Sequence, residues 1–195
     1  MNHTTLIAGL LALTGSAAFA QAPANTVQRD VNQEQRIEQG LKSGELNTRE
    51  AATLQREESR VNRMQSNAMK DGKLSAAEQA RLNSAQNKVS KDIYDAKHNA
   101  ATGNPNSASS QRMQADVQRN INQQQRIENG IQNGSLTNRE AARLEGGQAR
   151  VARKEARAGA DGHVGAGEQA RIQNSENRQS NRIYHQKHDA QERKN

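Results

Sequence analysis

The sequence predicts an all-α protein made of two tandem three-helix units joined by a flexible linker. Residues 27–100 align with residues 117–190 without a gap, and 35 of the 74 aligned positions are identical. A fixed period of this length indicates a repeated supersecondary unit. The composition is rich in Gln, Asn, Arg and Ala and only 2% aromatic, which favours helix or disorder over sheet. Apolar residues recur at three- and seven-residue spacing, as on one face of a helix.

The first helix of the unit is expected over residues 27–39, with Val31 and Ile37 on its apolar side and Gly40 as its C-terminal stop. The second helix is expected over residues 48–68 and the third over residues 76–98. The apolar stripes are Ala51, Leu54, Val61 and Ala68 in the second helix and Ala80, Leu82, Ala85, Val89 and Ile93 in the third.

Each unit has two turns with one formula: a glycine, any residue, an aliphatic residue, a capping residue and, three positions later, a glutamate. The four pairs of cap and glutamate are Asn47–Glu50, Ser75–Glu78, Thr137–Glu140 and Gly165–Glu168. In such a capping box the cap side chain accepts from an N–H of the new helix, and the glutamate accepts from the N–H of the cap. Gly165 has no side chain for the first of these bonds, so the last turn is expected to be looser.

Residues 1–20 have the features of a secretory signal, with a short apolar core at 6–13 and the cleavage site Ala18-Phe19-Ala20. The apolar run is too short for a bilayer, which takes about 20 helical residues. We therefore expect a periplasmic or secreted protein without a transmembrane segment. The expected parts are a signal peptide (1–20), a disordered tail (21–26), helical repeat one (27–100), a linker (101–113), helical repeat two (114–190) and a second tail (191–195).

The chain has no cysteine, and only 32% of its residues are hydrophobic, so it must fold without disulfides around a thin core. Its net charge is +7, but cations and anions alternate at helical spacing, which dilutes the excess. This pattern predicts weak attraction to polyanions, with an anionic cell-envelope polymer or an unknown protein client as partner. It does not predict dedicated nucleic-acid binding, because the sequence lacks base-stacking aromatics and phosphate-binding glycine loops.

The turns at Asp71 and Asp161 resemble the second half of an EF-hand calcium loop. Each aspartate is followed by a glycine and, seven positions after it, by Glu78 or Glu168, which matches the spacing in that loop. In the second copy, however, the position of the first ligand holds an arginine. A capping box explains the same glycine and glutamate without an ion. Capping is the preferred interpretation, and calcium binding at these four residues is the alternative.

A second metal hypothesis concerns the end of the last helix. His185, His188 and Asp189 are three to four residues apart, so they share one face of a helix. Imidazole and carboxylate groups are ligands for copper, zinc and nickel. A solvated helix end is the preferred interpretation, because cationic groups interact favourably with the helix dipole there, and metal binding is the alternative.

Both units keep a tyrosine and a histidine four residues later, Tyr94 with His98 and Tyr184 with His188. A buried tyrosine that closes the end of a thin bundle is the preferred interpretation. The alternative is an exposed aromatic and basic patch that binds a partner.

No motif in the sequence predicts catalysis. The chain has no cysteine, no G-x-S-x-G and no H-E-x-x-H. Its carboxylates are expected to keep ordinary pKa values, because so few apolar residues cannot form a cleft that shifts them. The sequence therefore predicts a non-enzymatic protein without a resident cofactor, with calcium or a transition metal as the alternative.

The repeated signature is R-I-E-x-G, G-x-L-x-x-R-E-A-A, D-G-x-x-x-x-x-E-Q-A-R and I-Y-x-x-K-H. It resembles a group of uncharacterised exported proteobacterial proteins with Arg- and Gln-rich helical units, and the resemblance covers nearly the whole mature chain. It implies export to the periplasm. Residues 46–50 and 136–140 are also similar, at lower specificity, to the L-T-x-x-Q motif of periplasmic helical stress chaperones, with Glu in place of Gln.

These features favour an exported, non-enzymatic helical protein that binds a partner or acts in stress, in the manner of a chaperone. The competing hypothesis is an ion-binding protein. It would hold calcium at the turns of Asp71 and Asp161, or a transition metal near His185 and His188.

Overall fold

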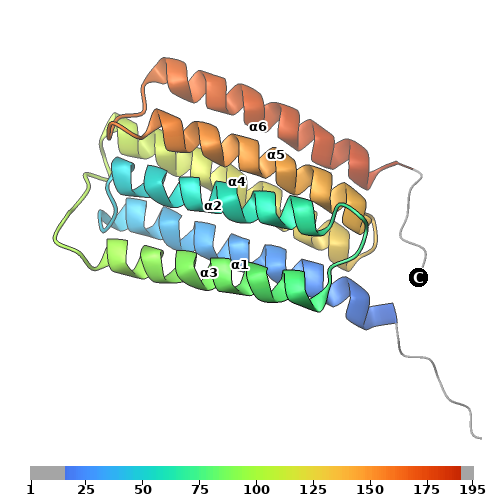
Figure 1. The fold of residues 1–195 in the computed structure, drawn as a ribbon. Coiled ribbons are helices and arrows are strands. Elements are labelled where there is room, and N and C mark those ends of the chain that lie inside the picture. Colours follow the sequence, from blue (N-terminus) through green and yellow to red (C-terminus); the bar gives the residue numbers. More distant parts are fainter. Residues whose placement is uncertain (1–15, 190–195) are drawn as a thin grey trace, which may run out of the picture.

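The computed structural model describes the backbone of residues 16–189 and the side chains of residues 22–189. All regular structure in this part of the chain is helical, as the sequence predicts (Figure 1). The helices are α1 (Ser16–Ser43), α2 (Thr48–Ala68), α3 (Ala76–Lys97), α4 (Ala108–Gln132), α5 (Asn138–Ala158) and α6 (Ala166–Lys187). Residues 1–15, which hold most of the expected signal, and the expected tail at 191–195 lie outside the described range.

The starts of the helices follow the turn chemistry. Asn47, Ser75 and Thr137 each accept a hydrogen bond from the backbone N–H three residues later, and the glutamate there accepts from the N–H of the cap. The predicted capping boxes of α2, α3 and α5 are thereby confirmed. At the start of α6 only the glutamate half remains, with Glu168 accepting the N–H of Gly165 at 2.9 Å.

The first helix is longer than predicted at both ends. It includes residues 21–26, for which the sequence predicts a disordered tail, and buries Ala24 and Thr26 against the bundle. Gly40 is also not its C-terminal stop. The helix continues to Ser43, and the next residue, Gly44, takes the positive φ of 81° that ends it.

Gly40 serves close packing instead. A Cβ at Gly40 would lie 2.7 Å from the Leu46 side chain, and one at the equivalent Gly130 would lie 2.6 Å from Leu136. The N–H of Leu46 donates to the carbonyl of Gly40 at 2.9 Å, and Leu136 donates to Gly130 at 2.8 Å. At both positions the chain folds back onto the helix so closely that only glycine fits.

The two three-helix units form one bundle. α1 packs along α4 and α2 along α5, while α3 and α6 cover opposite edges (Figure 1). The apolar clusters are shared between the units. Ile37 of α1 and Met113 of α4 belong to one cluster, and Val27 of α1 and Ile127 of α4 belong to the other. Burial therefore holds the units together, and neither has a core of its own.

Equivalent residues of the two units make reciprocal contacts, so an approximate twofold axis relates the units. Arg49 donates to the carbonyl oxygen of Asp161 at 2.9 Å, and its counterpart Arg139 donates to that of Asp71 at 3.2 Å. Ser59 Oγ donates at 2.8 Å to the carbonyl of residue 149, which occupies the same place in the second unit. A residue that meets its own counterpart lies close to such an axis.

The connection between the units is shorter than the predicted linker and is held by hydrogen bonds. α4 begins at Ala108, so residues 108–113 are helical and Met113 is fully buried. Gly103 donates its N–H to the carbonyl of Gly44 at 2.8 Å, and a Cβ there would clash with the carbonyl oxygen of Leu46. Residues 101–107 therefore pack against the turn between α1 and α2.

Candidate functional sites

The two turns that resemble EF-hand loops connect the units. Asp71 Oδ1 accepts a hydrogen bond from the backbone N–H two residues later at 2.9 Å. The carbonyl oxygen of Asp71 accepts a hydrogen bond from the guanidinium of Arg139 in the other unit. The second turn repeats this arrangement with Asp161 and Arg49. The D-G pair and the arginine of R-E-A-A, both present in each copy, are thus two sides of one contact between the units.

The glutamates of the predicted calcium sites are capping residues. Glu78 Oε2 accepts the N–H of Ser75, and Glu168 Oε2 accepts the N–H of Gly165, each at 2.9 Å. Within the described side chains, no three His, Asp or Glu residues come together in a group that could hold a metal ion. The predicted carboxylates therefore cap helices and shape turns.

The predicted transition-metal ligands have separate neighbours. His188 Nδ1 lies 2.7 Å from the carbonyl oxygen of Tyr184, and Asp189 accepts from Gln186 at 3.4 Å. His185 meets the Tyr184 ring edge-on, with 5.7 Å between ring centroids. The three side chains do not form one ligand group.

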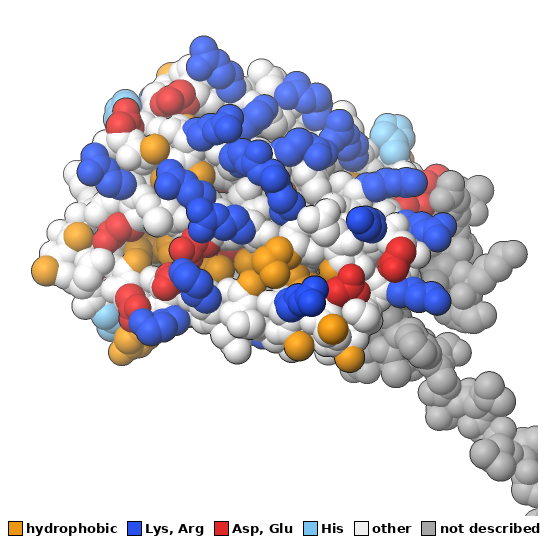
Figure 2. Space-filling model, in the orientation of Figure 1, with side chains coloured by type: hydrophobic (Ala, Val, Ile, Leu, Met, Phe, Trp, Pro, Cys, Tyr) orange, Lys and Arg blue, Asp and Glu red, His pale blue; other side chains and the backbone are white. Residues whose placement is uncertain are grey.

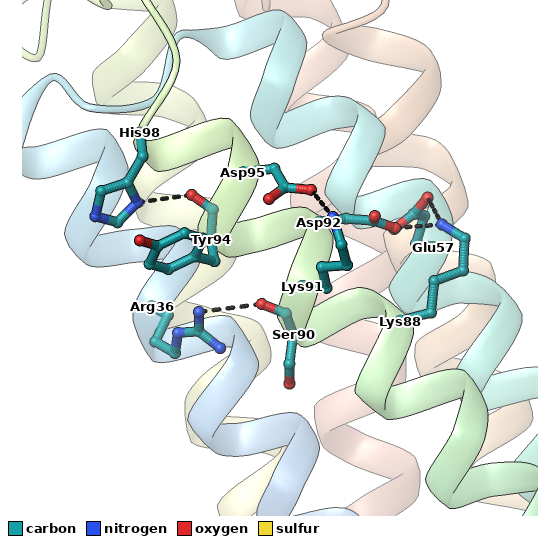
Figure 3. Close-up of polar contacts among 9 residues, drawn as sticks. All are labelled: Arg36, Glu57, Lys88, Ser90, Lys91, Asp92, Tyr94, Asp95 and His98. Carbon is teal, nitrogen blue, oxygen red and sulfur yellow. Dashed lines mark hydrogen bonds and ion pairs between the residues drawn. The ribbon is translucent and has the colours of Figure 1, made fainter.

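Tyr94 and Tyr184 are exposed, with 57% and 55% of their surface accessible. Each stacks on the histidine four residues later, with ring centroids 4.0 Å apart for Tyr94 and His98 (Figure 3) and 4.3 Å apart for Tyr184 and His188. The buried interpretation is wrong, because the isoleucine just before each tyrosine takes the inward position. Partner binding by these stacked pairs stays a prediction.

The interior contains a set of buried carboxyl groups, none of which belongs to the predicted sites. This buried acid cluster consists of Asp30 and Glu34 on α1, Glu58 on α2, Asp116 on α4, Glu145 and Glu155 on α5, and Glu176 on α6. Ionised carboxylates are rarely buried unless a cation accompanies them. In the described part of the chain only Glu176 has such a partner, with Oε2 2.8 Å from Arg119 Nε.

Several of these acids pair with an amide, and the two units exchange the acid and the amide. In the first unit, Gln55 on α2 donates to Glu34 on α1 at 2.6 Å. In the second unit the same positions hold Glu145 and Gln124, and Gln124 donates at 3.2 Å. The second exchanged pair is Asp30 with Gln65 in one unit and Asn120 with Glu155 in the other. Each position takes either group, while each pair keeps one acid and one amide.

Burial leaves many carboxyl oxygens of the cluster without a donor. Both oxygens of Glu58 and Asp116, and one each of Glu145 and Glu155, have no hydrogen-bond partner among the described residues. The space between Glu34 and its neighbours on α2, α4 and α5 has no room for a water molecule. An ionised carboxylate would therefore lie in a dry interior with unpaired lone pairs, whereas a protonated one supplies its own donor.

Burial raises the pKa of every member of the cluster, so the expectation of ordinary pKa values is wrong. The pKa of Asp116 rises to about 7 and that of Glu176 to about 8, although Arg119 acts in the opposite direction on both. The members whose pKa values are also raised, first by burial, are Asp30, Glu34, Glu58, Glu145 and Glu155. In mild acid the interior is therefore mostly uncharged.

A groove of about 520 Å³ between α5 and α6 is the second candidate site. Its cationic lining comes from Lys154 and Arg157 on α5 and Arg171 and Arg178 on α6. Lys and Arg side chains gather over these two helices (Figure 2). The same residues look scattered in the sequence, because only the antiparallel pairing of α5 and α6 brings them side by side.

Substitutions between equivalent positions of the two repeats indicate both sites in the sequence. The acid–amide exchanges mark the cluster, and the replacement of Asp92 by Arg182 marks the cationic surface of α5 and α6.

Comparison with known proteins adds no relative. No protein-family model, no curated protein and no solved structure matches this chain. Of the helices in the described range, none combines the length and apolar character that crossing a membrane requires.

Proposed function

We propose that this chain is an exported, non-enzymatic helical protein that serves in stress at low pH, with a bundle that is most stable when its buried acids carry protons. The observation that supports this proposal is the buried acid cluster, in which seven carboxyl groups lie inside the bundle and only Glu176 pairs with a cation. The signal-like residues 1–20 support export.

Protonation and folding are linked in such a protein. An unfolded Asp or Glu has a pKa near 4, whereas the folded protein holds the protons of Asp116 and Glu176 up to about pH 7 and 8. Between these limits the folded state binds more protons than the unfolded state, so the free energy of unfolding falls as pH rises. The stabilisation is fully present below about pH 4 and is lost as the pH passes through 7 to 8.

The groups that face the cluster do not reverse this direction. The acids mainly face one another: Asp30, Glu34, Glu57 and Glu145 act on Glu58, and Glu34, Asp116 and Glu176 act on Glu155. The opposing cations are Arg29 near Asp30, and Arg119 near Asp116 and Glu176. At each of these carboxyl groups the arginine lowers the pKa by less than burial raises it.

The test is a series of thermal melts from pH 4.5 to 8.5, followed by circular dichroism. Loss of about 3 kcal/mol over this range would lower the midpoint by about 10 °C in a protein of this size. The triple variant Glu58→Gln, Glu145→Gln and Glu155→Gln should flatten the dependence, because the amide keeps the shape of the neutral acid. The other unit already holds glutamine at each of these positions.

The matched control removes exposed acids instead. Asp95→Asn with Glu45→Gln changes two carboxylates that lie on the surface, and the midpoint should keep its full dependence on pH. A wild-type midpoint that stays constant or rises between pH 4.5 and 8.5 would refute the proposal.

A further inference from the structure

Six exposed cations lie on α5 and α6, and four of them, Lys154, Arg157, Arg171 and Arg178, line the groove between the two helices. They are Arg150, Lys154 and Arg157 on α5 and Arg171, Arg178 and Arg182 on α6. Lys154 and Arg178 both donate to the hydroxyl oxygen of Ser175, Arg178 at 3.3 Å, so the two charges lie on either side of one atom. Partial burial and repulsion by Arg182 lower the pKa of Arg150, so these two are also close.

Acids do not neutralise this surface. None of the six cations takes part in an ion pair with the side chains described, from residue 22 to residue 189. Glu155 and Glu176, on the same two helices, are fully buried on the opposite side. Glu168, which accepts the N–H of Gly165, also lines the groove, so one negative charge stands against the six positive ones. Like charges at this distance repel, and an anion between them would relieve the repulsion.

The first unit has the same surface without the excess charge. The equivalent positions hold Arg60, Met64 and Asn67 on α2 and Arg81, Lys88 and Asp92 on α3. There, Lys88 lies between Asp92 and Glu57, with Nζ 3.1 Å from Glu57 Oε1 (Figure 3). In the second unit Gly147 stands where Glu57 is, and Arg182 stands where Asp92 is. The second unit thus loses both acids and gains three cations, Lys154, Arg157 and Arg182, that the first unit lacks.

We propose that the groove between α5 and α6 binds a linear phosphate polymer along its length. Arginine is suited to this ligand, because its planar guanidinium donates two parallel hydrogen bonds to phosphate oxygens. The first and last of the three α5 cations are seven positions apart, about 10 Å along the helix, so this surface contacts several phosphates in succession. No aromatic residue lines the groove, so it has no side chain on which a nucleic-acid base could stack. It would therefore bind the phosphates of a polymer and not its bases.

This inference is independent of the buried acids, so either proposal can fail alone. Inorganic polyphosphate is the probe, because it has neither base nor sugar. Its affinity for the protein is measured by calorimetry at 50 and 200 mM salt. The groove variant Lys154→Met, Arg157→Asn and Arg182→Asp installs the residues of the first unit and changes the net charge by −1, −1 and −2, a total of −4.

The control variant, Lys70→Glu with Lys73→Glu, also changes the charge by −4 but lies at the exposed turn before α3. We expect the groove variant to bind at least tenfold more weakly, with a shallower salt dependence, and the control to lose less than threefold. Thermal melts check that both variants fold. The groove variant should melt at or above the wild-type temperature, because it removes like-charge repulsion.

The remaining probes separate the sources of negative charge. Single-stranded DNA that competes with polyphosphate supports the inference, since it presents a chain of phosphates. Equal weakening of both variants would overturn it, because total charge would then explain the binding. Polyglutamate that binds as tightly as polyphosphate would also overturn it, as would binding only to anionic lipid vesicles and to no soluble polymer.

Discussion

At the residue scale, two glycines hold positions that helix propensity alone would give to another residue. Gly40 and Gly130 lie inside α1 and α4, where alanine is usually more stable by about 1 kcal/mol. Here the side chains of Leu46 and Leu136 occupy the space that a Cβ would need. The leucines anchor the start of the following turn, so the glycine and the turn depend on each other.

Gly40→Ala and Gly130→Ala should each lower the free energy of unfolding by about 1–3 kcal/mol, because the added methyl group overpacks the contact with leucine. Urea denaturation measures this. Gly167→Ala is the control, since Gly167 lies in the first turn of α6 with no atom within 4 Å of the added Cβ. That variant should gain about 0.5–1 kcal/mol. If Gly40→Ala and Gly130→Ala both left the stability unchanged, the leucine side chains would have to move aside at no cost, which contradicts the prediction.

The residues of the core were only partly visible in the sequence. Ala51, Leu54 and Val61 are buried as their spacing predicts. Glu57 and Glu58 are adjacent, but only Glu58 is fully buried. Charged residues are expected in solvent, because they are rarely buried without a partner. Burial of Glu58 depends on the second unit covering that face of α2, and no pattern within the first unit encodes it.

At the element scale, local chemistry decides what could be predicted. The bounds of α2 agree with the prediction, and those of α3 agree to within one residue, because a capping residue fixes each start. The N-terminal part of α1 has no such signal, and its helical state depends on contacts such as Thr26 with Gln79 of α3. Tertiary packing therefore extends the helix beyond what the sequence pattern indicates.

The D-G turns allow a direct test of the calcium hypothesis. Asp71→Ala with Asp161→Ala removes an acceptor for a backbone N–H at each turn, which should cost about 0.5–2 kcal/mol per turn, as for a lost cap. If the aspartates only shape these turns, the loss is the same in EDTA and in millimolar calcium. Thermal melts of wild type and variant under both conditions measure it. A calcium-dependent rise in the wild-type midpoint that the variant lacks would instead establish an ion site.

At the scale of the whole molecule, the number and order of the helices were predictable, and the way the units combine was not. The repeat and its capping boxes give three helices per unit. The pairing of α1 with α4 and of α2 with α5 needs surfaces from both copies. Both candidate sites depend on such helix pairing, which is why the predicted site residues and the observed clusters differ.

Because the apolar clusters are shared, the units should stay together without the covalent connection. A protease site inserted between Asn104 and Pro105, in the loop before α4, allows the folded protein to be cut. The two fragments should elute together in size-exclusion chromatography and separate only in denaturant. Fragments that separate under native conditions would contradict the shared core.

The reciprocal contacts of Arg49 and Arg139 show that the two units are arranged like the subunits of a symmetric dimer, although they belong to one chain. In a true homodimer every substitution occurs on both halves, so a new cationic face would appear twice and double the repulsion. In the fused arrangement the two halves vary separately. One half keeps Lys88 neutralised by acids while the other presents its cations, and an acid on one side is matched by an amide on the other. Because both halves lie in one chain, their surfaces can differ in charge while the symmetric packing is kept.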